Sequence, residues 1–575
     1  MTPRRVSRRT FLRTASAAAA VLPLLSACTT SVPAAPTAAP TAAATAVRAS
    51  GTAQPKSVAL GALPTFTPVQ GPPPQLPGTP DGLVSPAWTS YPKASLFQSV
   101  KPTPGRGGDV SVTLEAIQPP GPPVDQNVAW QAINKAVNAK LNVTIIPFGD
   151  FNAKWATIQS SNDLPDLMCT ITRPDIPIVP AFLNARCTDL TPYLAGDAVK
   201  DYPNLAAIPT RSWKSTLING KIYGVPIPLR PYFWWFWVHQ ETLEQAGLKM
   251  PTSAADFKDI AQKVNKPQSN VWAIGGNGGS QYVFDTVEGL WNSVFGAPNY
   301  WSVDSAGKFT YVFEAPQYRD ALAYAADLVS AGVYHPNTLA YNVLSGRNDF
   351  MGRKMVFRED GLQSMYGAYW GGVNAPPMDP PSHITLVPPF SADGNAKPVY
   401  YFGRPNFGMA LVKQGDDAHT REMLRILDFF AAPFGSTEWQ LINYGVEGPD
   451  FAFDDQGNPV LTDQGRAEFM PWNSLVTGQP YYWSIQEPNA AQVYQGYEKL
   501  LAPLGVEDAS IGTFSATFAS KGTLLLDALG SGAQDIAAGR RPMSDLDGLV
   551  QDWRNNGGNQ IKNELAASYA QLMSS

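Results

Sequence analysis

The sequence has few of the residues that carry most enzymatic and metal chemistry. Only four of its 575 residues are histidine and only three are cysteine. His239, His335, His383 and His419 lie far apart, no HExxH motif occurs, and the cysteines lack metal-site spacing. There is no GxSxG motif, and the glycine-rich stretch at 275–279 lacks the Lys-Ser/Thr of a phosphate-binding loop. The sequence therefore predicts no cofactor and no metal site.

Charged residues are also scarce, at 15% of the chain. The 42 Lys and Arg against 47 Asp and Glu give a formal charge of −5. Five of the arginines lie in the first 27 residues, which contain no acid, so the chain without them has 37 basic and 47 acidic residues. A nucleic-acid partner requires a basic surface. The charge balance therefore argues against nucleic-acid binding.

The apolar stretch at the N-terminus is too short to span a membrane, which takes about 20 residues. Ala15–Leu25 follows SRRTFLR (Ser7–Arg13), a twin-arginine export signature. It ends in Leu-Ser-Ala-Cys at 25–28, which resembles a bacterial lipobox. These features predict a signal peptide over 1–27, lipidation of Cys28, and an extracytoplasmic protein held to the cell membrane by acyl chains. The alternative is ordinary cleavage with an incidental cysteine.

Two cysteines remain after position 28, and their state is left open by the sequence. In an exported protein Cys169 and Cys187 either form a disulfide or stay as buried free thiols.

Residues 28–108 are rich in proline, alanine and threonine and include 15 of the 53 prolines. Such a segment buries too little apolar surface to fold, and proline keeps it extended. We expect a linker that lifts the folded part off the membrane. Trp88, Tyr91 and Phe97, near its end, are candidates for docking onto the domain.

The segment after the linker alternates strand and helix patterns. Asp109–Ala116 has the β-branched alternation of a strand, 127–141 is predicted to be a helix, and 142–148 a second strand. Leu164–Thr170 is a further short apolar run. This order predicts an α/β lobe with a largely parallel sheet, and the chain length predicts two or more lobes.

Two later helices have clear boundary signals. Thr252 or Ser253 can cap a helix over 255–264, whose apolar residues share one face. Ser544 can cap a helix with apolar residues at 546, 549, 550 and 553, and Gly557-Gly558 is expected to end it.

Aromatic residues are abundant, with 15 Trp, 22 Tyr and 26 Phe. Many fall in four groups: Tyr232–Trp237, Met365–Gly372, Val399–Phe407 and Gln479–Gln486. Most individual rings are expected in the core, but groups beside Arg230, Arg404 and Asn277 favour a ligand cleft, because sugar rings stack on aromatic faces. In an extended chain Arg230, Tyr232, Trp234 and Phe236 face one side, and Phe233, Trp235 and Trp237 the other.

Several stretches, in order, resemble the extracellular solute-binding lipoproteins of ABC importers, in particular the carbohydrate-type family 1. They are INGKIYGVPIPLR (Ile218–Arg230), VHQETLEQAGLKMPTSAADFKDIAQKV (Val238–Val264), FMGRKMVFREDG (Phe350–Gly361) and the C-terminal GRRPMSDLDGLVQDWRNNGGNQIKNEL. Val238-His239 replaces the Tyr-Asn that is usual in this family.

This resemblance implies a two-lobed α/β fold, periplasmic-binding-protein-like of type II, with a ligand cleft between the lobes. Lobe 1 is expected over 109–228 plus 398–470, and lobe 2 over 229–397 plus 471–575. It implies a monomer that captures a small polar ligand, most simply a mono- or oligosaccharide, and delivers it to ABC permease subunits without chemical change.

The resemblance and the aromatic groups together give a set of expected ligand contacts. They are Trp370, Arg404, Arg230, Tyr232, Trp234, Asp175, Asn277, Tyr282, Glu359, Tyr369 and Trp483.

Two other functions remain open. A surface glycoside hydrolase or lyase needs only two suitably placed carboxylates, and Glu359-Asp360 is the pair to examine first. A peptide-binding module on the same fold is the other alternative, because a fold does not fix a ligand.

Overall fold

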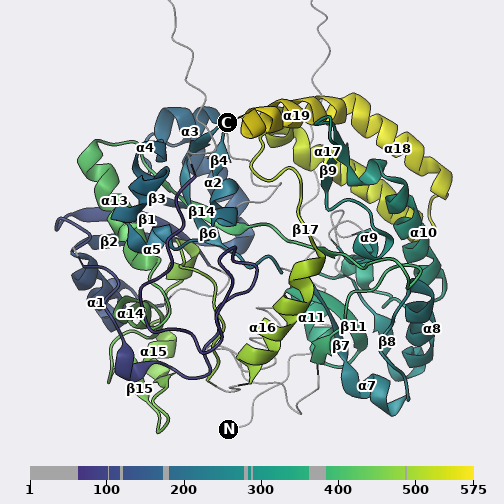
Figure 1. The fold of residues 1–575 in the computed structure, drawn as a ribbon, viewed down its shortest axis with the longest axis horizontal. Coiled ribbons are helices and arrows are strands. Elements are labelled where there is room, and N and C mark those ends of the chain that lie inside the picture. Colours follow the sequence, from purple (N-terminus) through teal and green to yellow (C-terminus); the bar gives the residue numbers. More distant parts are fainter. Residues whose placement is uncertain are drawn as a thin grey trace, which may run out of the picture. The chain divides into compact units, whose positions relative to one another are not determined.

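The computed structural model describes residues 63–101, 103–116, 121–171, 180–232, 234–276, 283–285, 289–361, 384–485 and 489–574. These residues belong to one compact unit. It contains two α/β lobes, each with its own sheet (Figure 1). No helix in these ranges is both long enough and apolar enough to cross a bilayer. The two-lobed α/β prediction is confirmed.

The sheet of the first lobe has the order β2-β1-β3-β14-β6. Its strands are β1 (Asp109–Ala116), β2 (Lys140–Pro147), β3 (Leu167–Ile171), β6 (Gly224–Pro228) and β14 (Asn406–Val412). β1 runs parallel to both β2 and β3, whereas β14 is antiparallel to its neighbours β3 and β6. The largely parallel sheet is therefore confirmed, with β14 as the strand of opposite direction.

Helix α1 (Val128–Val137) covers this sheet and is capped at both ends. The Asn127 side chain accepts a hydrogen bond of 2.8 Å from the Trp130 amide. The helix ends at Asn138, whose φ of 50° is left-handed, a conformation that asparagine tolerates. Buried Trp130, Ile133 and Val137 face the core.

The sheet of the second lobe has the order β12-β7-β11-β8. Its strands are β7 (Trp234–His239), β8 (Trp272–Ile274), β11 (Met355–Gly361) and β12 (Ile384–Leu386). Helices α8 (Ala254–Val264) and α10 (Pro316–Ser330) share a core with it. Ser253 caps α8 by accepting from the Asp256 amide at 3.1 Å, so the predicted helix and one of its two candidate caps are confirmed.

The aromatic run is mostly core, and within β7 it alternates as predicted. Phe236 packs on Phe257 and Trp291 on one face of the sheet. Trp235 and Trp237 stack on each other on the opposite face, with ring centroids 5.5 Å apart. Tyr232 precedes the strand, and its ring lies beside Trp235, so the predicted alternation does not extend back to it.

The C-terminal helices α17 (Ala516–Ala537), α18 (Leu546–Trp553) and α19 (Asn559–Ser574) pack on the second lobe. Ser544 is not the predicted cap, because it lies inside a 3-10 turn, Met543–Asp545. Gly557-Gly558 does not end the helical segment either. The chain bends there through a π turn at Arg554–Gly558, in which Gly557 has a φ of 153°, and continues into α19.

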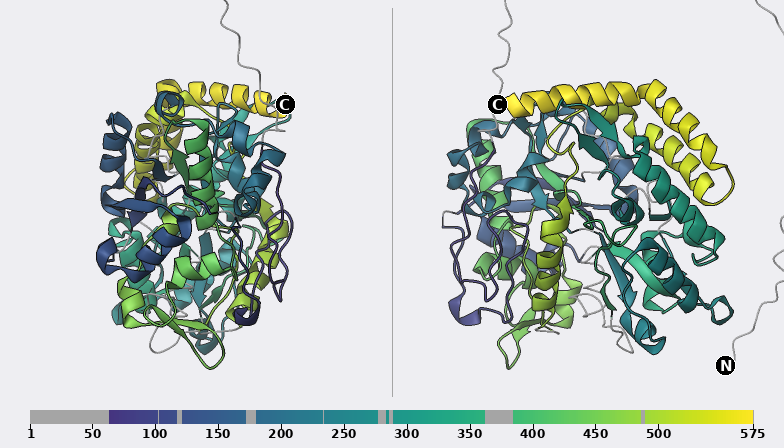
Figure 2. Two further views of the ribbon diagram at one scale, coloured as in Figure 1. Left: turned by 90° about the vertical axis from the view of Figure 1, so that its left-hand side faces the viewer. Right: turned by 45° about the vertical axis from the view of Figure 1, so that its right-hand side comes forward.

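Residues 63–101, which we call the strap, are not the predicted free linker. The Thr65 amide donates to Gly196 at 2.9 Å, and the Thr437 amide donates to Phe97 at 2.9 Å. Trp88 and Tyr91 are buried against the domain, as their predicted docking requires. Figure 2 shows the strap as the dark purple trace along the first lobe. The strap is held in place because amides and carbonyls of the lobes form hydrogen bonds with its backbone.

The remaining elements are shorter or lie at the edges of the lobes. The other helices are α2 (Phe151–Ser160), α3 (Pro180–Arg186), α4 (Thr191–Leu194), α5 (Pro203–Ala206), α6 (Thr210–Lys214), α7 (Gln240–Gln245), α9 (Leu290–Phe295), α11 (Val343–Met351), α13 (Asp417–Phe430), α14 (Thr437–Tyr444), α15 (Asp463–Ala467) and α16 (Ala490–Leu501). The short strand pairs are β4 (Leu217–Ile218) with β5 (Lys221–Ile222), β9 (Trp301–Val303) with β10 (Phe309–Tyr311), β15 (Phe451–Phe453) with β16 (Pro459–Leu461), and β13 (Tyr400–Tyr401) with β17 (Gly505–Val506).

A buried carboxylate in the first lobe makes its stability depend on pH. Asp428 on α13 accepts from the Asn204 and Leu205 amides at 2.8 and 3.0 Å and so caps α5. Burial raises the pKa of Asp428 to about 7, an effect that those two amides oppose. Between the unfolded value and about 7, the folded state therefore binds more protons than the unfolded state.

We predict that Asp428 contributes a fall in the free energy of unfolding as pH rises from 4 to 7, because ionising Asp428 costs more in the folded protein. Urea denaturation across this range measures the slope. Asp428→Asn keeps a carbonyl acceptor for the two amides and removes the titration, so its slope should be shallower. An identical slope in the variant would contradict the assignment.

Candidate ligand site and hinge

Two segments carry the chain between the sheets and lie against each other. Residues 229–232 follow β6 on the way to β7, and 402–405 connect β13 to β14. The Gly403 amide donates to the Pro231 carbonyl at 2.8 Å, and the Leu229 amide donates to Pro405 at 3.1 Å. Connecting segments that are hydrogen-bonded to each other in this way form the hinge of a two-lobed protein.

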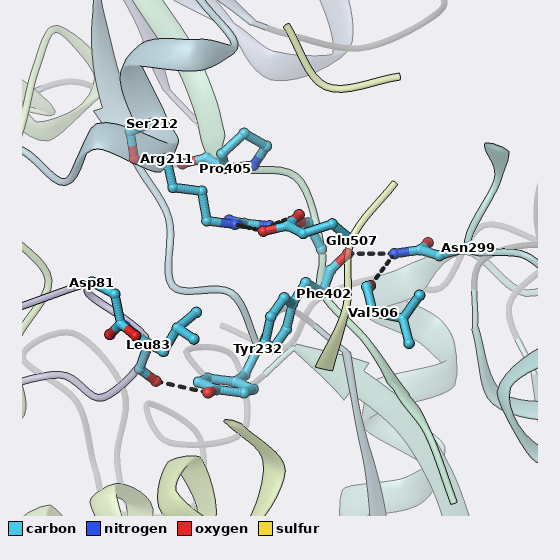
Figure 3. Close-up of polar contacts among 11 residues, drawn as sticks. Asp81, Leu83, Arg211, Ser212, Tyr232, Asn299, Phe402, Pro405, Val506 and Glu507 are labelled. Atoms are coloured by element: carbon cyan, nitrogen blue, oxygen red, sulfur yellow. Dashed lines mark hydrogen bonds and ion pairs between the residues drawn. The ribbon is translucent and has the colours of Figure 1, made fainter. Parts of the chain in front are cut away.

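A third segment joins this hinge through a buried asparagine (Figure 3). The Asn299 side-chain amide, 2% exposed, donates to the carbonyls of Phe402 at 2.9 Å and Val506 at 2.8 Å. The Phe402 amide itself donates to Val506 at 3.0 Å. One side chain from the second lobe therefore fixes two hinge segments at once.

Arg211 and Ser212, on α6 of the first lobe, hold the same segments from the other side. The Arg211 guanidinium makes a bidentate pair with Glu507, at 2.5 and 3.0 Å, and also donates to the Gly403 carbonyl. Ser212 donates to Pro405 at 2.8 Å. Bidentate arginine pairs are geometrically specific, so this contact fixes Glu507, while the bonds to Gly403 and Pro405 hold the 402–405 segment beside it.

A hollow with a volume of about 320 Å³, which we call the larger hollow, begins at the hinge. Its wall combines aromatic rings with side-chain amides and a single charged group. The lining residues that define it are Arg230, Trp439, Asn443, Asn473, Thr477, Gln479, Tyr481, Tyr482 and Trp483. Flat apolar faces beside amide donors and acceptors suit a sugar, whose C–H faces stack on rings while its hydroxyls need hydrogen-bond partners.

Arg230 is the one charged residue among the described residues that line this hollow. It donates to the Tyr481 carbonyl, and its guanidinium carbon lies 4.3 Å from the centre of the Tyr482 ring. Its Nε lies 3.8 Å from Oε1 of Glu498, which is fully buried behind the wall. Burial raises the pKa of Glu498, and the Arg230 charge opposes that rise.

The smaller hollow, with a volume of about 50 Å³, lies in the second lobe. Trp234, Phe236, Glu359 and Tyr400 are among its lining residues. This volume admits a few water molecules but not a sugar ring.

The predicted site residues therefore divide between these two places. Arg230 and Trp483 meet at the larger hollow, and Trp234 and Glu359 meet at the smaller one. Arg404 is half-buried on the 402–405 hinge segment. Tyr232, 1% exposed, faces the strap, where its hydroxyl donates to the Leu83 carbonyl at 2.7 Å. The rest lie outside the described residues: Trp370, Asp175, Asn277, Tyr282, Tyr369 and the lipidation site Cys28.

The two cysteines are free thiols, which is one of the two states that the sequence left open. Cys169 and Cys187 are free and buried, without a disulfide between them. Burial raises the pKa of both thiols. They are packing residues of the first lobe.

Glu359 and Asp360 do not form a facing pair of carboxylates. They are successive residues of β11, and their partners Phe236 and Trp235 on β7 pack on opposite faces of the sheet. Asp360 is bound by Arg347, at 3.0 and 3.1 Å, and by Arg358 at 3.0 Å. The Glu359-Asp360 candidate for glycoside hydrolysis is therefore wrong. Within the described ranges no cluster of His, Cys, Asp and Glu could hold a metal ion.

Several wall residues were not predicted from sequence. Trp439, Asn443 and Asn473 stand in segments without an aromatic cluster, and they reach the hollow only through the fold. Tyr481 and Tyr482 lie in the 479–486 group that the sequence singled out, although only Trp483 was named. The Tyr-Tyr-Trp sequence at 481–483 was the signal from which these two wall residues could have been predicted.

Comparisons with known proteins agree with this architecture. No protein-family model matches the chain. It is 21% identical to Lipoprotein LipO of Bacillus subtilis, over 84% of this chain and 98% of that protein. It is 22% identical to the polygalacturonan/rhamnogalacturonan-binding protein YtcQ of the same organism, over 78% and 89%.

Among solved structures, the chain is similar to an HMO-binding, ABC-transporter-associated solute-binding protein of Bifidobacterium longum infantis. The TM-score is 0.60 at 11% identity, with 81% of this chain and 99% of that one covered. The predicted resemblance to solute-binding lipoproteins is confirmed, and the fold is that of two-lobed solute-binding proteins.

We predict that Asn299→Ala lowers the free energy of unfolding by about 1–3 kcal/mol, because it leaves the buried Phe402 carbonyl without this donor and removes one of the two donors to the Val506 carbonyl. Urea denaturation measures the loss. Asn395, an exposed asparagine whose side chain bonds only its own loop, is the matched control, and its alanine variant should change stability by less than about 0.5 kcal/mol. Equal effects in the two variants would contradict a hinge role for Asn299.

Proposed function

We propose that this protein is an extracytoplasmic, membrane-anchored solute-binding protein that captures a carbohydrate and delivers it to an ABC importer. The observation that carries the proposal is the larger hollow, where aromatic rings, side-chain amides and Arg230 surround about 320 Å³ beside the hinge. This is enough room for one or two sugar rings.

The named relatives point to the same ligand class. One of them binds polygalacturonan and rhamnogalacturonan, and the solved structure binds HMO. An acidic sugar would find a cation in Arg230, and its ring would find the Trp439, Tyr481 and Trp483 side chains. Oligogalacturonides are therefore the first ligands to test.

Ligand capture depends on closure of the two lobes about the hinge. A ligand that contacts both lobes favours a closed state by its higher affinity for that state, and the closed form is then recognised by permease subunits. The bound sugar is released unchanged. The segments at 229–232 and 402–405 are the hinge about which this closure takes place.

Anchoring is the part of the proposal that rests on sequence. The twin-arginine signature at 7–13 and the lipobox-like 25–28 support export and lipidation of Cys28, and one relative is a lipoprotein. We further propose that the mature protein acts as a monomer.

The glycoside hydrolase and peptide-binding alternatives differ from this proposal in what they predict. A hydrolase releases shortened products from an oligosaccharide, whereas a binding protein returns it intact. A peptide-binding module is stabilised by peptides and not by sugars.

We predict that the mature protein melts a few degrees higher with trigalacturonate or a related oligosaccharide, because a ligand of the native state at about 100 times its Kd adds about 2.7 kcal/mol. Differential scanning fluorimetry against a panel of acidic and neutral oligosaccharides measures the shift. Chromatography of the incubated sugar checks that it is unchanged.

Two tryptophan variants then locate the ligand. Trp483→Ala should weaken binding of that sugar about five- to twelvefold, because stacking on one aromatic ring contributes about 1–1.5 kcal/mol. Trp234→Ala is the matched control, because Trp234 is also half-buried but lines the smaller hollow. Titration calorimetry measures both. Loss of binding in the Trp234 variant alone would place the ligand in the second lobe and refute this assignment.

Cys28→Ser should release the protein from the membrane fraction and abolish its labelling with radioactive palmitate, because the thiol that carries the lipid is gone. Cys169→Ser provides the control, because that buried thiol should leave labelling unchanged. Unaltered labelling of the Cys28 variant would refute lipidation at this residue.

A further inference from the structure

The strap forms the back of the larger hollow. Ala87 and Tyr482 pair as a β-bridge, in which the Trp88 amide donates to Tyr482 at 2.8 Å and the Tyr482 amide donates to Pro86 at 2.9 Å. Tyr482 is itself a wall residue of the hollow. The strap backbone therefore sets the position of one edge of the site.

Glu498 on α16 joins the strap to the same wall through its side chain. Its carboxylate accepts from the Ser85 amide at 2.6 Å and from the Ser85 hydroxyl at 3.1 Å. It also accepts from the Tyr482 hydroxyl at 2.9 Å and lies 3.8 Å from Arg230. One buried carboxylate thus contacts the strap and two residues that line the hollow.

Gln495, one turn earlier on α16, strengthens this junction. Its side-chain amide donates to the carbonyls of Leu76, Pro77 and Ser85, at 2.9–3.1 Å. The strap between 76 and 85 is therefore held on α16 by side chains of two neighbouring helical turns. A Pro-rich segment offers few amides of its own, so these bonds decide its path.

Aromatic rings of the strap also pack against the wall of the larger hollow. Tyr91 lies 5.4 Å from Trp483 and 6.1 Å from Trp439, measured between ring centroids. Trp88 lies 6.2 Å from Tyr481 in an edge-on arrangement. The three aromatic wall residues named here each have a strap ring behind them, so their orientation depends on the strap being seated.

We propose that Glu498 is a positioning residue for the ligand site: it seats the strap against α16 and thereby fixes Arg230, Tyr482 and the aromatic wall. This inference rests on the proposed function, since the wall matters only if the larger hollow holds the ligand. The sugar does not touch Glu498. Its effect is transmitted through the groups that it holds.

The test compares Glu498→Ala and Glu498→Gln with Glu422→Ala in the full mature protein. Glu422 is the matched control, because it is also a buried glutamate and also holds chain that precedes β1, through the Arg106 amide at 2.7 Å and its Nε at 2.8 Å. It does not line the hollow. Both alanine variants lose a buried acceptor, so both should be destabilised.

The first measurement is amide hydrogen exchange by mass spectrometry, without ligand. Glu498→Ala should exchange about tenfold faster in peptides covering 76–91 and 479–485, because both sides of the strap junction are loosened. Glu422→Ala should leave those peptides at the wild-type rate. Glu498→Gln, which keeps a carbonyl acceptor, should lie between the wild type and Glu498→Ala.

The second measurement is affinity for trigalacturonate by titration calorimetry at a temperature where every variant is folded. We expect binding about tenfold weaker in Glu498→Ala, partly restored in Glu498→Gln, and unchanged in Glu422→Ala. Wild-type exchange at 479–485 in Glu498→Ala, or undiminished affinity in that variant, would overturn the proposal. Should Glu498→Ala fail to fold, Ser85→Ala and Glu498→Gln carry the same comparison.

The two proposals fail in different ways. If the wild-type protein binds none of the saccharides, the proposed function fails, while the exchange experiment still decides whether Glu498 holds the wall. If the wild type binds and Glu498→Ala binds equally well, the sugar-binding function stands and the positioning role is overturned.

Discussion

The whole arrangement depends on the pairing of β14 between β3 and β6. β14 comes from the later part of the chain, after the second sheet is complete, yet it supplies a central strand of the first sheet. The chain must therefore leave the first lobe after β6 and return before β14. Two crossings follow from this one strand pairing, and their mutual hydrogen bonds make the hinge. The larger hollow begins where the first crossing leaves β6.

Much of this fold was accessible from sequence, because it rests on local patterns. The strand at Asp109–Ala116, the Ser253 cap and the two faces of β7 are set by strand propensity, capping and periodicity, which neighbouring residues determine. The ordered motifs from 218 to 361 supplied the two-lobed architecture. The functional class followed from the same resemblance.

What could not be predicted depends on contacts between distant segments. The strap was expected to be a free linker because of its composition. It is held in place by hydrogen-bond partners on α16 and the first lobe, which the sequence does not identify. Glu498 is spaced with buried Tyr494 and Leu501 on one face of α16, so the sequence could have indicated that it is buried. The sequence could not have shown that Ser85 and Arg230 are its partners. The assembly of Trp439 with Trp483 is likewise a product of tertiary packing.

The attachment of the strap at Pro64 and Thr65 has a mechanical consequence. These residues bond to Gly196 of the first lobe, before the strap reaches the hinge. In the anchored protein proposed above, tension on the N-terminal tether therefore reaches the first lobe at Gly196 before it reaches the hinge. The contacts of the strap with Glu498 and Gln495 on α16 come later along the chain, so the contact at Gly196 shields the ligand site from that tension.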